Sequence, residues 1–419
     1  MSLFRLAYLS LRNRWLTALL TIISIAVSVA LLIGVEKVRN GARTSFADTI
    51  YGTDLIIGAR TGNIQLLLYS VFRIGNATNN ISWQSYNEIS ARPEVKWSVP
   101  LSLGDTHKGF RVLGTSRAYF QHYQFRGGQQ LGFASGAPFD DLFDAVVGVD
   151  VAAELGYTVG SSIVVSHGLG KISEGDHDDL PFQVSGVLAK TGTPVDRTVH
   201  VSLKAIEAIH VGWGSGRKQP GLLPAAETLR KLPLSPKAIT AAMVGVKSKI
   251  AIFRLQRFVN EYKEEPLVAV FPGVALQELW GLVGTAEQAL VAVAAMVVVA
   301  ALLGLATMIL STLNERRREM AILRSVGASP ARVTLLLLTE AAVLAAMGVL
   351  LGLVLLYAGL AVAQPVIDAR YGLYLPIELP SPGELAMLAI VFSGALLFAL
   401  LPALRAYRMS LADGMTVRS

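Results

Sequence analysis

The stretch that decides the fold covers residues 289–332 and reads ALVAVAAMVVVAALLGLATMILSTLNERRREMAILRSVGASPAR. Its first part is apolar over about 25 residues, and about 20 helical residues suffice to cross the roughly 30 Å of hydrocarbon in a bilayer. Its second part is short and rich in arginine. Because cytoplasmic loops carry an excess of Lys and Arg, this order predicts a transmembrane helix that ends on the cytoplasmic side.

Three further apolar runs accompany this one, so that the candidate spans are residues 16–35, 288–313, 333–363 and 385–404. One run precedes a long polar segment, residues 36–287, and three follow it. The chain is 53% hydrophobic and 16% charged, whereas soluble domains carry about 25% charged residues. The sequence therefore predicts a membrane protein with four transmembrane α-helices in a one-plus-three arrangement. A large α+β extracytoplasmic domain is expected between the first and second helices.

The positions of the basic residues predict the orientation. Arginines gather in residues 1–15, 314–332 and 405–419, whereas residues 364–384 contain one arginine and three acidic residues. The positive-inside rule then places both termini in the cytoplasm, including an amphipathic N-terminal segment over residues 1–15. The large domain is expected in the periplasm and the spans in a bacterial inner membrane. Many of the basic residues behind the formal charge of +7 lie beside the apolar runs. The charge therefore does not indicate a nucleic-acid partner.

The first run has one alternative interpretation, a cleaved signal peptide. Its apolar part is longer than the usual 7–15 residues of such a peptide, and no small-residue cleavage site follows it. An uncleaved anchor is therefore favoured. The chain contains no cysteine, which excludes disulfides and cysteine-based metal or redox chemistry.

Within the outer domain, short β-branched or alternating segments predict strands at residues 145–149, 162–166, 182–188 and 198–202. Short helices are expected at residues 150–155, capped by Asp150, and at residues 203–209. Residues 212–236 are rich in Gly, Pro and basic residues and indicate an exposed loop or hinge. Residues 36–50 and 274–287 have helical periodicity and would extend the first two spans outward as stalks. The stalks could carry motion or could be simple connectors.

The basic loop after the second span predicts a short amphipathic helix. Met320, Leu323 and Gly327 share one face, charged residues surround that face, and a turn at residues 327–330 ends the helix. Composition alone favours an interfacial anchor for such a helix.

The sequence of this loop resembles that of ABC transporter permeases of the MacB, LolC/LolE and FtsX type. In that family, a Glu-Arg-Arg-x-Glu pattern followed by Leu-Arg-Ala-Ile-Gly-Ala comes after the second span and forms the coupling helix that docks on a cytoplasmic ATPase. The resemblance implies an ATPase-coupling surface made of Glu315, Arg316, Arg317, Glu319, Met320, Leu323, Arg324 and Gly327.

The resemblance extends over nearly the whole chain. In the third span Glu340 precedes Gly348 and Gly352, as the family's acidic residue precedes its glycine-rich stretch. VGVDVAAELG at residues 147–156 and VSGVLAKTGTPVDR at residues 184–197 are similar to the core of the MacB-like periplasmic domain. LPALRAYR at residues 401–408 is similar to the family's tail, although Ser410 stands where proline is usual. The chain is identified as an FtsX-like permease with a MacB-like periplasmic core domain.

The resemblance also implies partners. The chain contains no Gly-x-x-x-x-Gly-Lys-Ser/Thr loop for nucleotide phosphates, and only about 15 residues precede the first span, so no fused ATPase is expected. ATP and Mg²⁺ would bind to a separate ATPase pair, and this chain would be a non-catalytic subunit. Two permease chains, both copies of this one, would face that pair. Membrane lipid and a periplasmic adaptor or lipoprotein are further expected partners.

Two features of the third span concern helix packing. Gly348 and Gly352, four residues apart, would allow close helix contact, either within the chain or across the dimer. Glu340 lies about 12 Å inside the span, where charged groups usually face the protein interior. Pairing with an interfacial arginine is favoured over a proton relay, because no second ionisable residue accompanies it in the span.

The outer domain contains one candidate metal site. His167, Asp176, His177 and Asp178 lie in a glycine-containing segment and could gather around zinc. The spacing matches no strict zinc signature, and a solvated loop is the favoured alternative.

For function, the expectation is a permease subunit that couples ATP hydrolysis to export, extraction or mechanotransmission in the periplasm. The alternatives are a non-transporting signalling scaffold that activates a periplasmic hydrolase or sensor, and a metal-linked binding module.

Overall fold

The computed structural model describes residues 12, 14–167, 180–211, 213–214, 217–218, 225–315, 322, 325, 328–371 and 377–408. The chain divides into two compact units. The first holds residues 1–41, 284–366 and 375–419, and the second holds residues 42–283 and 367–374.

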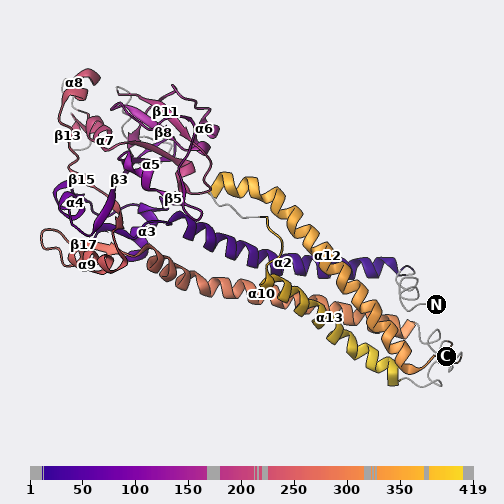
Figure 1. Ribbon diagram of the computed structural model, residues 1–419. Helices are drawn as coiled ribbons and strands as arrows, with labels where there is room; N and C mark the ends of the chain where they lie inside the picture. The colour runs from indigo at the N-terminus through magenta and orange to yellow at the C-terminus, as the bar shows by residue number, and fades with distance from the viewer. Residues whose placement is uncertain are drawn as a thin grey trace. The chain divides into compact units, whose positions relative to one another are not determined.

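Four helices of the described residues are long and apolar enough to cross a membrane. They are α2 (Trp15–Thr49), α10 (Pro272–Glu315), α12 (Pro330–Tyr371) and α13 (Pro382–Arg408), and they contain the four apolar runs (Figure 1). Helix α12 continues past residue 363 into the segment expected as a loop, although Pro365 lies within it. Likewise, α13 continues through residues 405–408.

The second unit is built around a mixed sheet with the strand order β17-β1-β16-β3-β4-β12-β8-β11-β7. In addition, β10 pairs with β3 and β9 pairs with β11. The pairs β4–β12 and β8–β11 are parallel, and the other pairs are antiparallel. The strands are β1 (Leu55–Ala59), β3 (Val95–His107), β4 (Phe110–Thr115), β7 (Phe133–Gly136), β8 (Asp144–Val147), β9 (Ser162–Ile163), β10 (Ser166–His167), β11 (Phe182–Leu188), β12 (Thr198–Ser202), β16 (Ala241–Val246) and β17 (Leu267–Val270).

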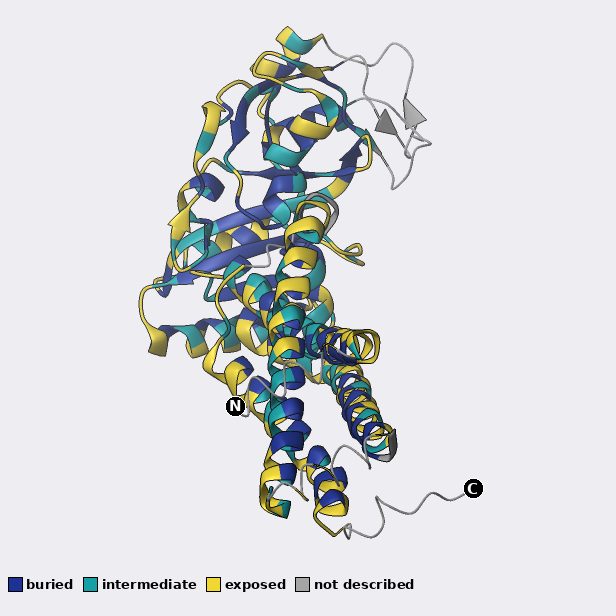
Figure 2. Ribbon diagram, turned by 90° about the vertical axis from the view of Figure 1, so that its right-hand side faces the viewer, coloured by how far each residue is buried: buried dark blue, intermediate teal, exposed yellow. Residues whose placement is uncertain are grey.

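Strands β1, β12 and β16 are buried along nearly their whole length, and Figure 2 colours the sheet mostly dark blue. A strand that is buried on both faces is a continuous apolar run, as LIIGA in β1 and AAMVGV in β16 are. The covering helices are α3 (Asn63–Ser70), α4 (Trp83–Ser90), α5 (Ala118–His122), α6 (Val149–Leu155), η1 (Pro194–Arg197), α7 (Leu203–His210), α8 (Ala226–Lys231) and α9 (Lys249–Asn260). Three small strand pairs complete the unit: β2 (Ile81–Ser82) with β15 (Ala238–Ile239), β5 (Gln124–Phe125) with β6 (Gln129–Gln130), and β13 (Trp213–Gly214) with β14 (Arg217–Lys218).

The architecture agrees with the predicted fold class of four apolar helices and an α+β domain between the first and second. The strands expected at residues 182–188 and 198–202 are confirmed. Three local predictions are wrong. Asp150 lies in the first turn of α6 and is not its cap, because Gly148 occupies the N-cap position. The strand expected at residues 162–166 is divided into β9 and β10, which pair with different strands. The expected loop at residues 212–236 contains α8.

Candidate functional site

The sequence predicted a close helix contact at Gly348 and Gly352, which lie in α12. A Cβ atom at Gly348 would lie 2.6 Å from Cγ2 of Ile25, and one at Gly352 would lie 2.7 Å from the carbonyl oxygen of Ala26. Both distances are below normal van der Waals contact. The structure therefore places the two glycines against α2 of the same chain, at positions where any larger residue would push the helices apart.

Glu340 lies earlier in α12 and is only 4% exposed. Leu337, Ala341 and Leu344, its neighbours along the helix, are also buried. The carboxylate thus faces the interior of the helical unit, in the manner expected for a charged residue within a span.

The outer end of the helical unit contains an ion pair that sequence reasoning missed. Nζ of Lys37 in α2 lies 3.2 Å from Oε2 of Glu384 in α13, and the two side chains are 11% and 4% exposed. Lys37 also donates to the carbonyl oxygen of Glu378 at 3.2 Å and lies 5.6 Å from the ring centroid of Tyr357 in α12. Three helices therefore meet at one largely buried cation.

A capping box holds Glu384 in position. Its carboxylate accepts from the backbone N–H of Ser381 at 2.9 Å, and the Ser381 hydroxyl accepts from the backbone N–H of Glu384 at 3.3 Å. Such reciprocal bonds satisfy two free donors at a helix start. The signal was present in the sequence, since Ser and Glu stand three residues apart just before the last apolar run. The partnership with Lys37 is long-range and has no local signal.

The stalk segments of α2 and α10 in the second unit contact one another. The ring of Phe46 lies 5.5 Å from the ring of Trp280, and the guanidinium carbon of Arg43 lies 5.5 Å from the same indole. Phe46 also stacks on Phe72 with the ring centroids 4.4 Å apart, and both stalks pack on the apolar core of the domain. The ends of both helices are thus joined to the outer domain by aromatic contacts.

The expected coupling surface lies almost entirely outside the described residues. Glu315 is the last residue of α10, and between it and residue 328 only Ile322 and Ser325 are described, both as helical. Helix α12 begins at Pro330, which suits the first position of a helix because that N–H has no intrahelical partner. The residues outside the description are Arg316, Arg317, Glu319, Met320, Leu323, Arg324 and Gly327.

The candidate metal ligands Asp176, His177 and Asp178 also lie outside the described residues, and His167 is described only as the last residue of β10. Over the described part of the chain, no group of three or more His, Asp or Glu residues could hold a metal ion.

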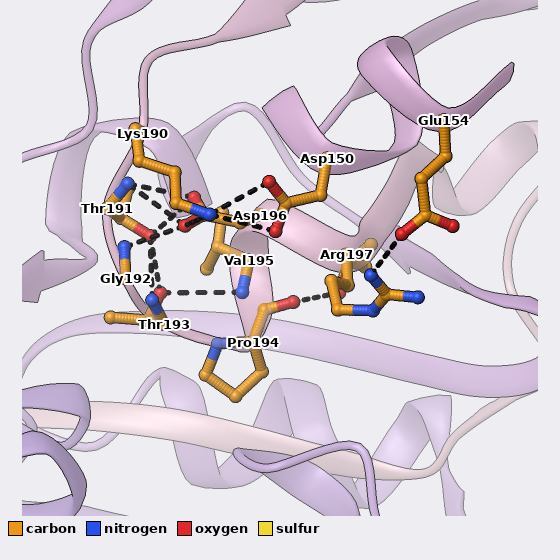
Figure 3. A network of polar contacts seen from close by, with 11 residues as sticks. Asp150, Glu154, Lys190, Thr191, Gly192, Thr193, Pro194, Val195, Asp196 and Arg197 are labelled. Carbon is orange, nitrogen blue, oxygen red and sulfur yellow. Dashed lines mark hydrogen bonds and ion pairs between the residues drawn. The ribbon is translucent and has the colours of Figure 1, made fainter. Parts of the chain in front are cut away.

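The two outer-domain segments that carried the family resemblance meet at a buried polar network around Asp196 (Figure 3). Asp196 is fully buried, and its carboxylate accepts from the N–H of Thr191 at 2.9 Å, the hydroxyl of Thr191 at 2.7 Å and the N–H of Gly192 at 2.6 Å. Lys190 pairs with Asp150 of α6 at 2.8 Å and lies 3.6 Å from Asp196. Burial raises the pKa of Asp196 above its ordinary value, against the opposing effect of these donors. The network fixes the turn between β11 and β12 against α6, which is a structural role.

The comparisons with known proteins agree with this architecture. The MacB-like periplasmic core domain matches residues 16–231, and the FtsX-like permease C-terminal domain matches residues 291–411. A search among curated proteins finds no match.

Two solved structures have low similarity to the chain. The periplasmic region of MacB from Actinobacillus actinomycetemcomitans is 12% identical and covers 56% of this chain and 97% of its own, with a TM-score of 0.34. The extracellular domain of the noncanonic ABC-type transporter YknZ from Gram-positive bacteria is 13% identical and covers 52% of this chain and 98% of its own, with a TM-score of 0.30.

The family assignment rests on the two domain matches, of which the first alone includes more than half of the chain. Their order along the chain also follows the observed helices, with the outer domain between α2 and α10. This chain therefore belongs to the ABC-transporter permeases of the MacB/FtsX type, with an FtsX-like permease domain and a MacB-like periplasmic core domain.

Proposed function

We propose that this chain is the membrane subunit through which a separate cytoplasmic ATPase drives mechanical work in the periplasm. Two copies of the chain would face two ATPase subunits, and the loop between α10 and α12 would dock on the ATPase. The material acted on would be exported or extracted on the outer side of the membrane. Permeases of this type work with a cytoplasmic ABC ATPase, which supports the first part of the proposal.

The observation that carries the proposal is the length of two unbroken helices. Helix α2 has 35 residues and α10 has 44, so they are about 50 Å and about 65 Å long at 1.5 Å per residue. The hydrocarbon layer needs only about 30 Å of each. Continuous helices of this length, joined to the outer domain through Phe46 and Trp280, suit the transmission of movement better than flexible connectors would.

The proposal is testable by spin labelling, because the chain has no native cysteine. A label at the exposed position 96, introduced by Lys96→Cys, reports the distance between two outer domains in the complex with the ATPase. We expect this distance to change on addition of ATP. Val283→Pro should abolish the change, since proline within a helix removes a backbone hydrogen bond and kinks the helix. Val283→Ala is the matched control and should retain it.

Docking requires a separate test. Replacement of Glu315, Glu319 and Arg324 by alanine should release the ATPase while the chain remains inserted in the membrane. An ATPase that still binds and is still stimulated by this variant would contradict the assignment of the coupling surface. If no ATPase purifies with the wild-type chain, the whole proposal is wrong.

Assays on the complex of this chain with its ATPase would also distinguish transport from signalling. Transport predicts that a substrate stimulates ATP hydrolysis, whereas a signalling scaffold predicts a bound periplasmic protein whose activity depends on ATP.

A further inference from the structure

A small polar cavity in the outer domain is lined by two arginines and by no acidic residue. Its volume is about 290 Å³. It is lined by residues of and after α3, from Tyr69 to Asn80, by Leu103 and Gly104 of β3, and by Arg111 of β4. The polar lining comes from Tyr69, Arg73, Asn76, Asn80 and Arg111. None of the sequence motifs that identify the family includes these residues.

The local backbone brings both arginines to the cavity. Arg73 follows α3 with φ of 60°, in the left-handed region that favours glycine and disfavours larger residues. Arg111 lies on β4 opposite Thr106, beside an irregularity in the β3–β4 register between Leu103 and Thr106. The chain thus has a long cationic side chain at a position where glycine would be less strained.

Both guanidinium groups have only neutral partners among the described residues. Arg111 donates to the carbonyl oxygen of Gly75 at 2.9 Å and to Oδ1 of Asn76 at 3.0 Å. Arg73 donates to the carbonyl oxygen of Ser70 and, at 3.4 Å, to the hydroxyl of Tyr119. Other cations of the same domain pair with carboxylates: Arg92 with Glu94, Arg117 with Asp140, Lys190 with Asp150, Arg197 with Glu154 and Arg230 with Asp141.

Neutral oxygens supply hydrogen bonds but no compensating charge. Burial, and then the positive charge of Arg73, lower the pKa of Arg111 below its ordinary value. Burial raises the pKa of Tyr69 to about 12, so its hydroxyl remains protonated at neutral pH. A guanidinium has five donors in a planar fork that matches the oxygens of a phosphate or carboxylate. An oxyanion in this cavity would supply the missing negative charge.

We infer that this cavity binds a phosphate group, carried by a soluble phosphate compound or by a phospholipid head group, with Arg111 and Arg73 as its cationic ligands. The cavity volume of about 290 Å³ is just below the roughly 300–1,000 Å³ of small-molecule pockets, which suits a group of the size of phosphate. The inference is independent of the ATP-driven movement proposed above.

The test uses the full chain in maltoside micelles, which contain no phosphate, at constant ionic strength. Isothermal titration with inorganic phosphate and with short-chain dihexanoyl phosphatidylglycerol should give saturable binding of at least one probe. Arg111→Gln should weaken that binding about tenfold or more, since a hydrogen bond to a charged group is lost. Arg117→Gln removes the same charge from an exposed ion pair outside the cavity and should change the affinity less than about twofold.

The two probes distinguish the sources of the phosphate group. Binding of inorganic phosphate indicates a soluble ligand, and binding of phosphatidylglycerol alone indicates a lipid head group. Absence of saturable binding of both, or equal weakening by the two variants, would overturn the inference.

Chemical footprinting of the wild-type protein tests the same inference without a variant, in case Arg111→Gln does not fold. The bound probe should slow modification of Arg111 by phenylglyoxal, measured by mass spectrometry, and should leave Arg117 unaffected. Equal rates at Arg111 with and without probe would also overturn the inference.

Discussion

Replacing Lys37 by methionine tests whether the buried ion pair at the outer end of the helical unit stabilises that unit. Methionine has a similar length and retains apolar packing, so the main loss is the charge. The Glu384 carboxylate contacts Nζ of Lys37 and the N–H of Ser381, and only the second contact would remain. The carbonyl oxygen of Glu378 would still accept from the Tyr357 hydroxyl at 2.7 Å, so its loss is small.

The magnitude follows from the burial of the pair. At 11% and 4% exposure, solvent screens the two charges little, and removal of one partner of a buried pair costs about 3–5 kcal/mol. We expect a loss near the lower end, about 3 kcal/mol, because Lys37 is slightly exposed. Combining Lys37→Met with Glu384→Met leaves no unpaired charge. The double variant should be only about 1 kcal/mol less stable than the wild type, the typical contribution of one hydrogen bond, because it loses the bond from the Ser381 N–H.

The assay again uses the absence of native cysteine. Ala395→Cys introduces a thiol at a fully buried position of α13, and its maleimide labelling is followed as SDS is added to maltoside micelles. Lys247→Met, at an exposed lysine outside the helical unit, is the control and should change the midpoint little. A Lys37→Met variant as stable as the control would refute the reasoning. So would a double variant whose loss equals the sum of the two single losses, since the pair would then have no coupling energy.

Three further outcomes are expected. Gly348→Leu should destabilise the helical unit by about 1–3 kcal/mol through overpacking, whereas Gly359→Leu, where a Cβ meets nothing within 4 Å, should be close to neutral in the same SDS titration. Asp196→Asn should cost about 1–3 kcal/mol in urea unfolding of the outer domain, because buried N–H donors lose acceptors; Asp140→Asn, at a mostly exposed aspartate, is the control. Burial lowers the pKa of His200 to about 3, so the unfolded chain binds more protons between pH 6.5 and 3. Outer-domain stability should therefore fall by up to about 1.4 kcal/mol per unit as pH decreases through that range, and His200→Phe should remove this part of the slope in urea titrations at pH 7 and 5.

The sequence predicted the features that depend on composition and local period. The spans follow from long apolar runs, and β11 and β12 follow from β-branched segments between turn residues. The order of elements also allowed the fold class to be predicted. Each of these signals lies within a few consecutive residues and needs no knowledge of the tertiary structure.

The features that were not predicted depend on contacts between distant segments. Gly148 precedes α6 because a Cβ there would lie 2.3 Å from the carbonyl oxygen of Asp196, and nothing in residues 145–155 indicates that approach. The same holds for Lys37 and Glu384, which meet only after α2 and α13 pack together. Asp150 was assigned as a cap on local preference, whereas its carboxylate pairs with Lys190.

Helix α2 contacts α12 and α13 at places far apart along its length, and this determines how coupling experiments must be controlled. The contact with Gly348 is at Ile25 and the ion pair is at Lys37, about 18 Å apart along the helix at 1.5 Å per residue. Sites this far apart without shared partners contribute additively to stability. Loss of one contact therefore leaves the other in place, so a single variant lowers stability without separating α2 completely from the other helices. A variant of the loop between α10 and α12 should accordingly be compared with a variant of the helical unit, such as Gly348→Leu, that has lost the same amount of stability. Only a defect in ATPase stimulation that exceeds the defect of that variant can be assigned to docking.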